Sequence, residues 1–312
     1  MSLAEIVVLG NTNVDLTAYI PHEIDEGETV IAKDFQIGLG GKGANQAVAA
    51  QRGGGKVSFI GRVGTDGFGS LMLSGLGKEN IDLNHLEKGP GESANATIWV
   101  QENGANRIAV FLGESENLDP ERVFEAVSTH TSASYFVSQL EIKQQVVLAG
   151  LSAAKKLDMT TILNIAPYSA LDSAILGVTD WLIANEIELM SLMKSSGLSH
   201  PDRLPSGELI NLLPSWSQKL GVNLIVTLGS EGAIGISHGA DPVFMKAPKV
   251  KPVDTVGAGD CFVGFFVAAL SKGLSWERAI RSGVLAASQS VQKPGAQASY
   301  PSTKEATDIH SS

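Results

Sequence analysis

Short apolar runs recur along the chain, and segments with the spacing of amphipathic helices separate them. Such runs predict buried strands of a parallel sheet, and the helical segments predict the crossovers between them. The predicted strands are Ile6–Leu9, Val57–Ile60, Tyr135–Val137, Thr161–Leu163, Trp181–Ala184 and Leu224–Leu228. The predicted helices are Ala44–Gln51, Phe68–Lys78, Pro120–Ser128, Lys143–Lys156, Glu186–Met193 and Gly207–Leu220. Because strands and helices alternate, we expect a three-layer α/β fold, a mostly parallel central sheet flanked by helices.

Two regions depart from this alternation. Thr17–Ile37 and Ala96–Leu112 alternate apolar and polar residues without an intervening helix, as half-exposed strands do. We expect them to form a small β-sheet that serves as a lid. No repeat, low-complexity tract or linker divides the chain, so we predict one domain over 1–312, with the lid formed by about 15–37 and 94–113.

The last third of the chain, from Asp254 on, is rich in helical patterns. A glycine-containing turn at 257–259 opens a strongly apolar segment, and a second helix is expected near Trp276–Val291. After Pro301 the sequence becomes polar, so we expect an irregular tail.

The amino-acid composition excludes more possible functions than possible folds. With 43% hydrophobic and 18% charged residues, the 312-residue chain can bury a large core. A formal net charge of −10 and a pI near 5.1 repel polyanions, which disfavours nucleic acid as a partner. The single cysteine, Cys261, excludes an internal disulfide and a cysteine-based zinc cage, so any metal should have oxygen ligands.

No segment predicts contact with a membrane. The first residues lack the basic start of a leader peptide, and the longest apolar stretch, Cys261–Leu270, is shorter than the roughly 20 residues that span a bilayer. We therefore expect a cytoplasmic protein.

The glycine-rich segment 38–43 formally satisfies the dinucleotide-binding fingerprint. That fingerprint needs a buried strand before it, whereas Ile31–Ile37 alternates polar and apolar residues, and a dehydrogenase would rest on this segment alone. The spacing of a P-loop is absent. Two interpretations remain: a tight turn, or glycines that let backbone amides approach a polar ligand, with Lys42 and Asn45 as donors.

A second glycine turn lies in the segment Asp254–Asp260, which reads DTVGAGD. A turn of this kind at the start of an apolar helix directs free N–H groups and the positive helix end at one point, which favours an anion. Asp260 would lie in the first helical turn. It would either complement the helix dipole or accept a hydroxyl proton beside a transferring phosphoryl group.

Polar residues follow three of the predicted strands. Asn13 and Asp15 would project on one side of an extended segment and suit a polyol, unless they form a capping turn. Asn185 and Glu188 could hold Mg²⁺ through water, cap the next helix, or do both. The segment Thr227–Gly232 is a strand–turn–strand that could admit nucleotide phosphates or be an ordinary hairpin.

The set of motifs resembles that of the ribokinase-like (PfkB) carbohydrate kinases over nearly the whole chain. Gly38–Ala50, GLGGKGANQAVAA, is similar to the family's first signature, and Asp254–Phe262, DTVGAGDCF, to its second. Also in the family order are Asn13 and Asp15, Gln139-Leu140-Glu141, Asn164, Asn185–Glu188 and Thr227–Gly232. The resemblance implies the family's fold, transfer of the γ-phosphoryl group of ATP to a sugar hydroxyl, and a homodimer formed through the lid.

The resemblance also implies residue roles. Asp260 would be the catalytic base, and Val256, Gly257, Ala258 and Gly259 would form the anion hole. The residues that would hold the sugar are Asn13, Asp15, Gly41, Lys42, Asn45, Glu141 and Asp260. Those that would hold ATP are Asn185, Glu188, Thr227, Gly229, Gly232, Val256, Gly257 and Gly259, with Glu188 reaching Mg²⁺ through water.

A monovalent-cation site follows from the same resemblance. Its expected members are Asp254, Val256, Ser290, Lys293, Gly295 and Ser299, with K⁺ as the ion. Val256, Lys293 and Gly295 would contribute backbone carbonyls, and Asp254 a full charge. A cation there would fix the anion-hole amides from behind without touching ATP.

The favoured substrate is a pentose, ribose before deoxyribose, phosphorylated on its primary hydroxyl. Another sugar or a nucleoside is the alternative within the family, and Val284 replaces the asparagine often found beside the adenine. A remote alternative is a sugar- or nucleotide-binding regulator without catalysis. The presence of Asp260, the glycine turn before it and Glu188 argues against such a regulator.

Overall fold

A computed structural model describes residues 6–198 and 204–312. Its central sheet has nine strands in the order β13-β12-β11-β10-β9-β8-β1-β4-β5. The strands are β1 Ile6–Leu9, β4 Val57–Gly64, β5 Leu86–Gly89, β8 Tyr135–Gln139, β9 Thr160–Asn164, β10 Trp181–Asn185, β11 Asn223–Thr227, β12 Gly232–Ile236 and β13 Val243–Lys246. Pairing is parallel from β11 to β5, while β12 and β13 are antiparallel. The mostly parallel sheet is therefore confirmed.

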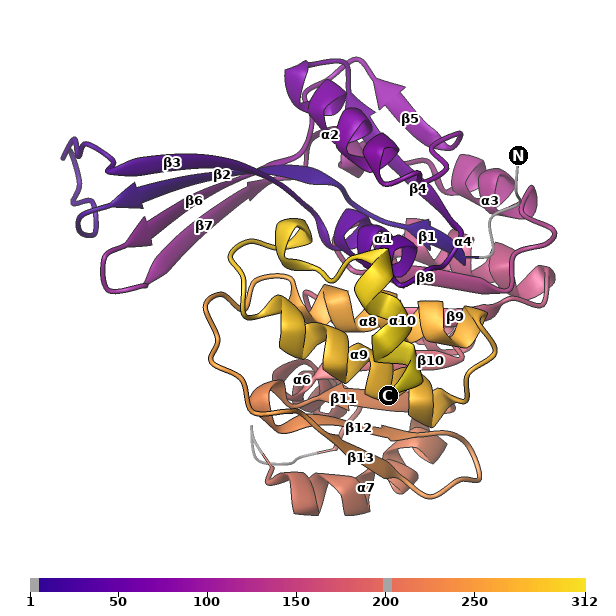
Figure 1. The fold of residues 1–312 in the computed structure, drawn as a ribbon. Coiled ribbons are helices and arrows are strands. Elements are labelled where there is room, and N and C mark those ends of the chain that lie inside the picture. The colour runs from indigo at the N-terminus through magenta and orange to yellow at the C-terminus, as the bar shows by residue number, and fades with distance from the viewer. Residues whose placement is uncertain (1–5, 199–203) are drawn as a thin grey trace.

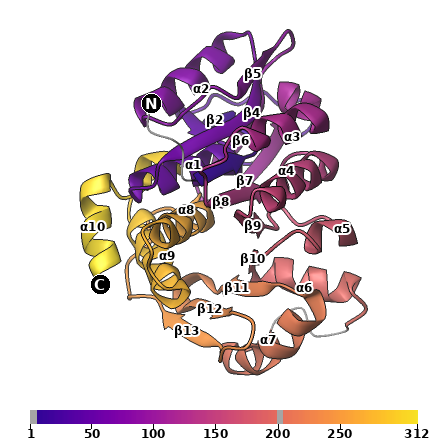
Figure 2. The same cartoon turned by 90° about the vertical axis from the view of Figure 1, so that its right-hand side faces the viewer.

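Helices cover both faces of this sheet (Figure 2). One face packs against α1 Lys42–Arg52, α2 Gly67–Lys78, α8 Ala258–Ser271 and α9 Trp276–Ser290, and α10 Thr303–Ser311 packs on the outside of α1 and α9. The other packs against α3 Pro120–Ser128, α4 Gln144–Lys156, α5 Ser173–Leu176, α6 Glu186–Ser195 and α7 Ser206–Leu220. In β1, Ile6 and Val8 enter the first core and Val7 and Leu9 the second, because successive strand residues point to opposite faces. The three-layer fold is confirmed, and no described helix is long and apolar enough to cross a membrane.

A separate four-stranded sheet projects from this body (Figure 1). Its order is β3-β2-β6-β7, with β2 Asn13–Ile20, β3 Asp34–Gly40, β6 Asn95–Gln101 and β7 Asn106–Phe111. We expected a half-exposed sheet, which is wrong for its outer strands. All six residues of β7 and the first five of β3 are exposed, because the described helix that contacts this sheet, α2, reaches only β2 and the end of β3 near Leu39.

The C-terminal segment is ordered, contrary to the irregular tail that its polarity suggested. The Ser302 side chain caps α10 by accepting a hydrogen bond from the Glu305 N–H. The Glu305 side chain accepts one from the Ser302 N–H, so both hydrogen bonds of a capping box are present. Ala306 and Ile309 are buried against the body, and His310 Nε2 lies 2.8 Å from the carbonyl oxygen of Gly53. The short apolar stripe was hidden among polar residues in the sequence.

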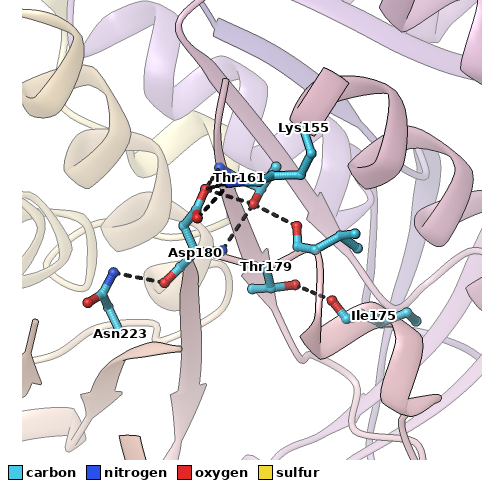
Figure 3. Close-up of polar contacts among 7 residues, drawn as sticks. Lys155, Thr161, Ile175, Thr179, Asp180 and Asn223 are labelled. Carbon is cyan, nitrogen blue, oxygen red and sulfur yellow. Dashed lines mark hydrogen bonds and ion pairs between the residues drawn. The ribbon is translucent and has the colours of Figure 1, made fainter. Parts of the chain in front are cut away.

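A polar network joins the amino ends of β9, β10 and β11 (Figure 3). Lys155 Nζ donates to both carboxylate oxygens of Asp180 at 2.8 and 3.0 Å, and the backbone N–H of Thr161 donates to Asp180 Oδ2 at 2.8 Å. Asn223 Nδ2 donates to the carbonyl oxygen of Asp180 at 2.9 Å. These bonds fix the start of three neighbouring strands, at the edge of the sheet opposite the carboxyl ends.

Candidate active site

The crevice at the carboxyl ends of the parallel strands is built around the start of α1. Strand β3 ends at Gly40 and α1 begins at Lys42, so the turn is the single residue Gly41, with φ 89°. A Cβ on Gly41 would lie 2.7 Å from the Cα of Thr12, so both the backbone angle and the contact require glycine. The dinucleotide interpretation of 38–43 is wrong, because the preceding strand belongs to the exposed small sheet.

Asn13 and Asp15 lie at the start of β2, beside this turn. Asn13 Nδ2 donates to Asp15 Oδ1 at 2.6 Å. Burial raises the pKa of Asp15, and the bond from Asn13 partly opposes that rise. The segment is extended, as expected, and is not a capping turn. It therefore presents an amide and a carboxylate together at the crevice.

Lys42 and Glu141 approach from α1 and from the loop after β8. The backbone N–H of Lys42 donates to Glu141 Oε2 at 2.7 Å. Attraction by the Asp260 carboxylate raises the pKa of the Lys42 ammonium against the effect of burial. Burial raises the pKa of Glu141, while the Lys42 ammonium and N–H act in the other direction. One cation thus lies among carboxylates that come from separate elements.

Asp260 occupies the first turn of α8 and is only 5% exposed. The helix begins after Gly257, which has φ 72°. Asn45 Nδ2 donates to Asp260 Oδ2 at 3.0 Å, and Gln46 Nε2 donates to Asp260 Oδ1 at 2.9 Å. The two glycine motifs, more than two hundred residues apart in the sequence, therefore meet at this carboxylate.

The sequence did not identify every residue in this cluster. Gln46 follows Asn45 in the first signature, yet nothing in its residue type indicated contact with Asp260. Tyr300 was also missed; its hydroxyl donates to the carbonyl oxygen of Gly257 at 2.9 Å and so supports the turn before α8. Only the packing of the C-terminal segment against α8 reveals this contact.

Asn185 and Glu188 form a capping box at the start of α6. Asn185 Oδ1 accepts from the Glu188 N–H at 2.9 Å, and Glu188 Oε2 accepts from the Asn185 N–H at 2.8 Å. The capping interpretation is therefore confirmed. Burial raises the pKa of Glu188, and its charge interacts with those of Lys42 and Asp260. Glu188 thus faces the same crevice while it caps the helix.

A cavity of about 650 Å³ opens beside the anion turn. It is lined by the predicted residues Thr227, Gly229, Gly232 and Gly259, together with Val284. The wall also contains residues that the sequence did not indicate, among them Pro248, Lys249, Phe262, Ala287, Ser288 and Val291. These come from the loop after β13 and from α8 and α9, so only the fold brings them together. The cavity has the size and mostly apolar wall of a small-molecule site.

Known proteins are similar to this chain in sequence and in fold. Residues 3–303 match the model of the pfkB family of carbohydrate kinases. The chain belongs to this family. The carbohydrate kinase is 33% identical over 308 residues to the ribokinase of Staphylococcus aureus, covering 98% of this chain and 99% of that one. It is 34% identical over 303 residues to the deoxyribokinase of Salmonella typhi, covering 96% and 97%. The structure of Arabidopsis thaliana ribokinase complexed with ribose and ATP superimposes with a TM-score of 0.89 at 30% identity over 99% of both chains.

Asp254 connects two loops of the carbohydrate kinase behind the anion turn. Its Oδ1 accepts from the Val256 N–H at 3.0 Å, and its Oδ2 accepts from the Gly295 N–H at 2.8 Å. The Ser290 and Ser299 hydroxyls donate to carbonyls within their own turns, at 2.9 and 2.8 Å. Their oxygen lone pairs therefore stay available as acceptors. Lys293 is exposed, and its charge interacts with that of Glu305.

Proposed function

We propose that this carbohydrate kinase transfers the γ-phosphoryl group of ATP to the primary hydroxyl of a pentose, ribose first and deoxyribose next. The observation that supports the reaction most strongly is the position of Asp260. Its buried carboxylate lies in the first turn of α8, while Ala258 and Gly259 of the same turn line the cavity. A base and a set of free N–H groups therefore share one helix start, where a cavity meets a polar crevice.

In the proposed step, Asp260 accepts the hydroxyl proton as the sugar oxygen attacks the γ-phosphorus. The bond from that phosphorus to the oxygen bridging it to the β-phosphate breaks, and ADP leaves. Within the turn from Val256 to Gly259, the Val256 and Ala258 N–H groups donate to Asp254 Oδ1 and to the Thr255 carbonyl oxygen. The N–H groups of Gly257 and Gly259, together with the Lys42 ammonium, therefore stabilise the charge on the transferring group. Asn13, Asp15, Gly41, Asn45 and Glu141 hold and orient the sugar, and Lys42 contributes to both tasks.

ATP would occupy the 650 Å³ cavity, with the adenosine against Val284 and the phosphates directed to the turn at 257–259. Thr227, Gly229 and Gly232 would line the nucleotide. Asn185 and Glu188 would organise Mg²⁺ through water. The described residues contain no group of three or more His, Cys, Asp or Glu that could hold an ion, so phosphate oxygens would complete the shell. When bound, Mg²⁺ neutralises phosphate charge.

An ADP-release assay over ribose, deoxyribose, hexoses and nucleosides tests the substrate. We expect the largest kcat/KM for ribose, a smaller value for deoxyribose, and little turnover of hexoses. The relatives in both the ribokinase and the deoxyribokinase groups motivate this order. A preference for a nucleoside or a hexose would replace the pentose assignment, and absence of ADP release with every sugar would favour the silent regulator.

We also propose K⁺ as an activator, held by Asp254 with Val256, Ser290, Lys293, Gly295 and Ser299. The contacts of Asp254 with the loops at 256 and 295 support this site. A cation there would fix the N–H groups of the anion turn. At constant ionic strength we expect kcat to be several-fold higher in potassium than in sodium or tetramethylammonium salts, with the preference lost in Asp254→Ala. Equal rates in all three salts would refute the site.

A homodimer formed through the small sheet completes the proposal. Phe35 and Ile37 lie on one face and Ile108 and Val110 on the other, and these four side chains are more than half exposed. Exposed apolar residues on both faces favour a partner that covers them. Light scattering should give twice the chain mass, and Ile108→Glu should give a monomer. We place the enzyme in the cytoplasm, where its buried thiol and its use of ATP fit.

A further inference from the structure

Two separate chains of side-chain amides hold the carboxylate of Asp260. In the first, Gln297 Nε2 donates to Asn45 Oδ1 at 3.0 Å, and Asn45 Nδ2 donates to Asp260 Oδ2 at 3.0 Å. In the second, Gln139 Nε2 donates to Gln46 Oε1 at 2.7 Å, and Gln46 Nε2 donates to Asp260 Oδ1 at 2.9 Å. Each carboxylate oxygen therefore has an amide donor whose own orientation is set by a second amide.

The second chain is closed to solvent. Gln46 is 1% exposed, so it has no surface for a sugar to contact. Its Nε2 also donates to Asn164 Oδ1 at 3.0 Å, and Asn164 Nδ2 donates to the carbonyl oxygen of Ile183 at 3.1 Å. Asn164 thus presents its oxygen to Gln46 while Gln139 presents its nitrogen. Turning the Gln46 amide over would place oxygen against both Asn164 Oδ1 and Asp260 Oδ1, so only one orientation fits.

We propose that Gln46 is a positioning residue for phosphoryl transfer: it fixes the plane of the Asp260 carboxylate, so that a free lone pair stays directed at the attacking hydroxyl. The proposal rests on the proposed function, in which Asp260 is the base. A carboxylate has about four acceptor sites, so the two amide donors leave others for the attacking hydroxyl. A fixed plane keeps one of these lone pairs directed at the hydroxyl while the sugar is bound.

Other ionisable groups also act on Asp260 and belong in any pH experiment. They are Lys42 of α1, Glu141 after β8, Glu188 of α6, Cys261 of α8 and Tyr300 after the short helix at 297–299. Substitution of Gln46 leaves all of them in place. A change in the pH profile relative to wild type therefore reports on the Gln46 contact.

The test uses two variants of the full-length enzyme. Gln46→Met removes the donor with little change of volume, and kcat should fall by about 10- to 100-fold, a part of the 10²–10⁴ contributed by a general base. Gln46→Glu places a carboxyl beside the base, so the two groups share a proton and the acidic limb of kcat/KM should move up by about one pH unit or more. The KM for sugar should change less than about threefold in both, because the contact acts on the base.

Gln51→Glu is the matched control, since it makes the same change of charge on the same helix. Gln51 accepts from the Val57 N–H at 3.1 Å, a bond that glutamate can also accept. Its rate and pH profile should match those of wild type. If the Gln46 variants do not fold, Gln139→Met, which leaves Gln46 Oε1 without its donor, should lower kcat and shift the same limb to a smaller extent.

The outcomes separate the two proposals. An unchanged kcat and pH profile in Gln46→Met and Gln46→Glu, with an inactive Asp260→Asn, would overturn the role of Gln46 alone. The same unchanged result in Gln139→Met would overturn it where the Gln46 variants cannot be purified. Full activity of Asp260→Asn would instead remove Asp260 as the base, and the proposed mechanism with it.

Discussion

The central sheet has one carboxylate in the polar network at its amino ends and several at its carboxyl ends, and their surroundings differ. At the amino ends, the Asp180 carboxylate accepts from Lys155 and Thr161, and its backbone carbonyl accepts from Asn223. At the carboxyl ends, several carboxylates share one ammonium, that of Lys42. The pKa values of Asp15, Glu141 and Glu188 are all raised there by burial.

This difference separates a structural cluster from a functional one. Asp180 is one-third exposed and its partners belong to the adjacent strands β9 and β11 and to α4, so its bonds stabilise the fold. The carboxylates of the crevice are less well compensated for their lost hydration, which is unfavourable to the folded protein without substrate. Substrate hydroxyls, phosphates and cations can supply the missing partners. Substitutions of Asp260, Asp15, Asp180 and Glu141 test this division, and their expected effects decrease in that order.

Asp260→Asn should lower kcat by about 10²–10⁴, the usual contribution of a positioned general base. The KM for sugar should change much less, because the lost interaction acts in the transition state. Asparagine can accept from only one of the two amides that donate to Asp260, so the free energy of unfolding should fall by about 1–3 kcal/mol while the variant still folds. A folded variant with the wild-type kcat would remove Asp260 from the mechanism and weaken the division between the two ends.

Asp15→Ala should weaken sugar binding by about 10- to 100-fold, because a hydrogen bond to a charged group is worth roughly 1.5–3 kcal/mol. ATP affinity of the sugar-free enzyme should not change. Titration calorimetry measures both, and Asp34→Ala, an exposed site on β3 of the same small sheet, is the control. Lower ATP affinity with intact sugar affinity would show that Asp15 contacts ATP and not the sugar.

Asp180→Ala should destabilise the protein by about 2 kcal/mol while leaving kcat within twofold of wild type. Most of this comes from the unpaired Thr161 N–H, because the ion pair with the half-exposed Lys155 contributes little. Urea unfolding and steady-state rates on the same preparation measure the two effects. Asp241→Ala, at an exposed loop position, should change neither. A large loss of kcat in a folded Asp180 variant would contradict a purely structural role.

Glu141→Gln should alter stability least, by at most about 1 kcal/mol, and the change should depend on pH. Burial raises the pKa of Glu141 in the folded state, so the stability linked to this group is present at low pH and is lost as the pH rises through the folded pKa. The glutamine side chain of the variant does not ionise at any of these pH values. Its stability relative to wild type should therefore increase from pH 4 to pH 8. A constant or opposite difference in urea melts would show that Lys42 fully compensates the Glu141 charge.

The sequence predicted the strands and helices well where a single periodicity dominates. Ile6–Leu9 was predicted with its observed bounds, and Phe68–Lys78 and Lys143–Lys156 each differ by one residue from α2 and α4. The sequence-based predictions failed where the exposure of a segment depends on which other elements pack over that segment. The polar segment after Pro301 became α10, and alternating residues at 106–111 became a strand exposed on both faces.

The residue types at the site were also readable from the sequence, because glycine turns, strand-end amides and a carboxylate at a helix start each have a local signal. Together with the family resemblance, these signals predicted the fold class, the chemistry of phosphoryl transfer and most of the residues to which roles are assigned. Contacts across the fold have no local signal. The amide chain through Gln139 and Gln46 joins β8, α1 and α8, and the cavity wall joins Thr227 to Val291. Only the tertiary structure decided these, since the packing of helices on a sheet brings distant residues within hydrogen-bonding distance.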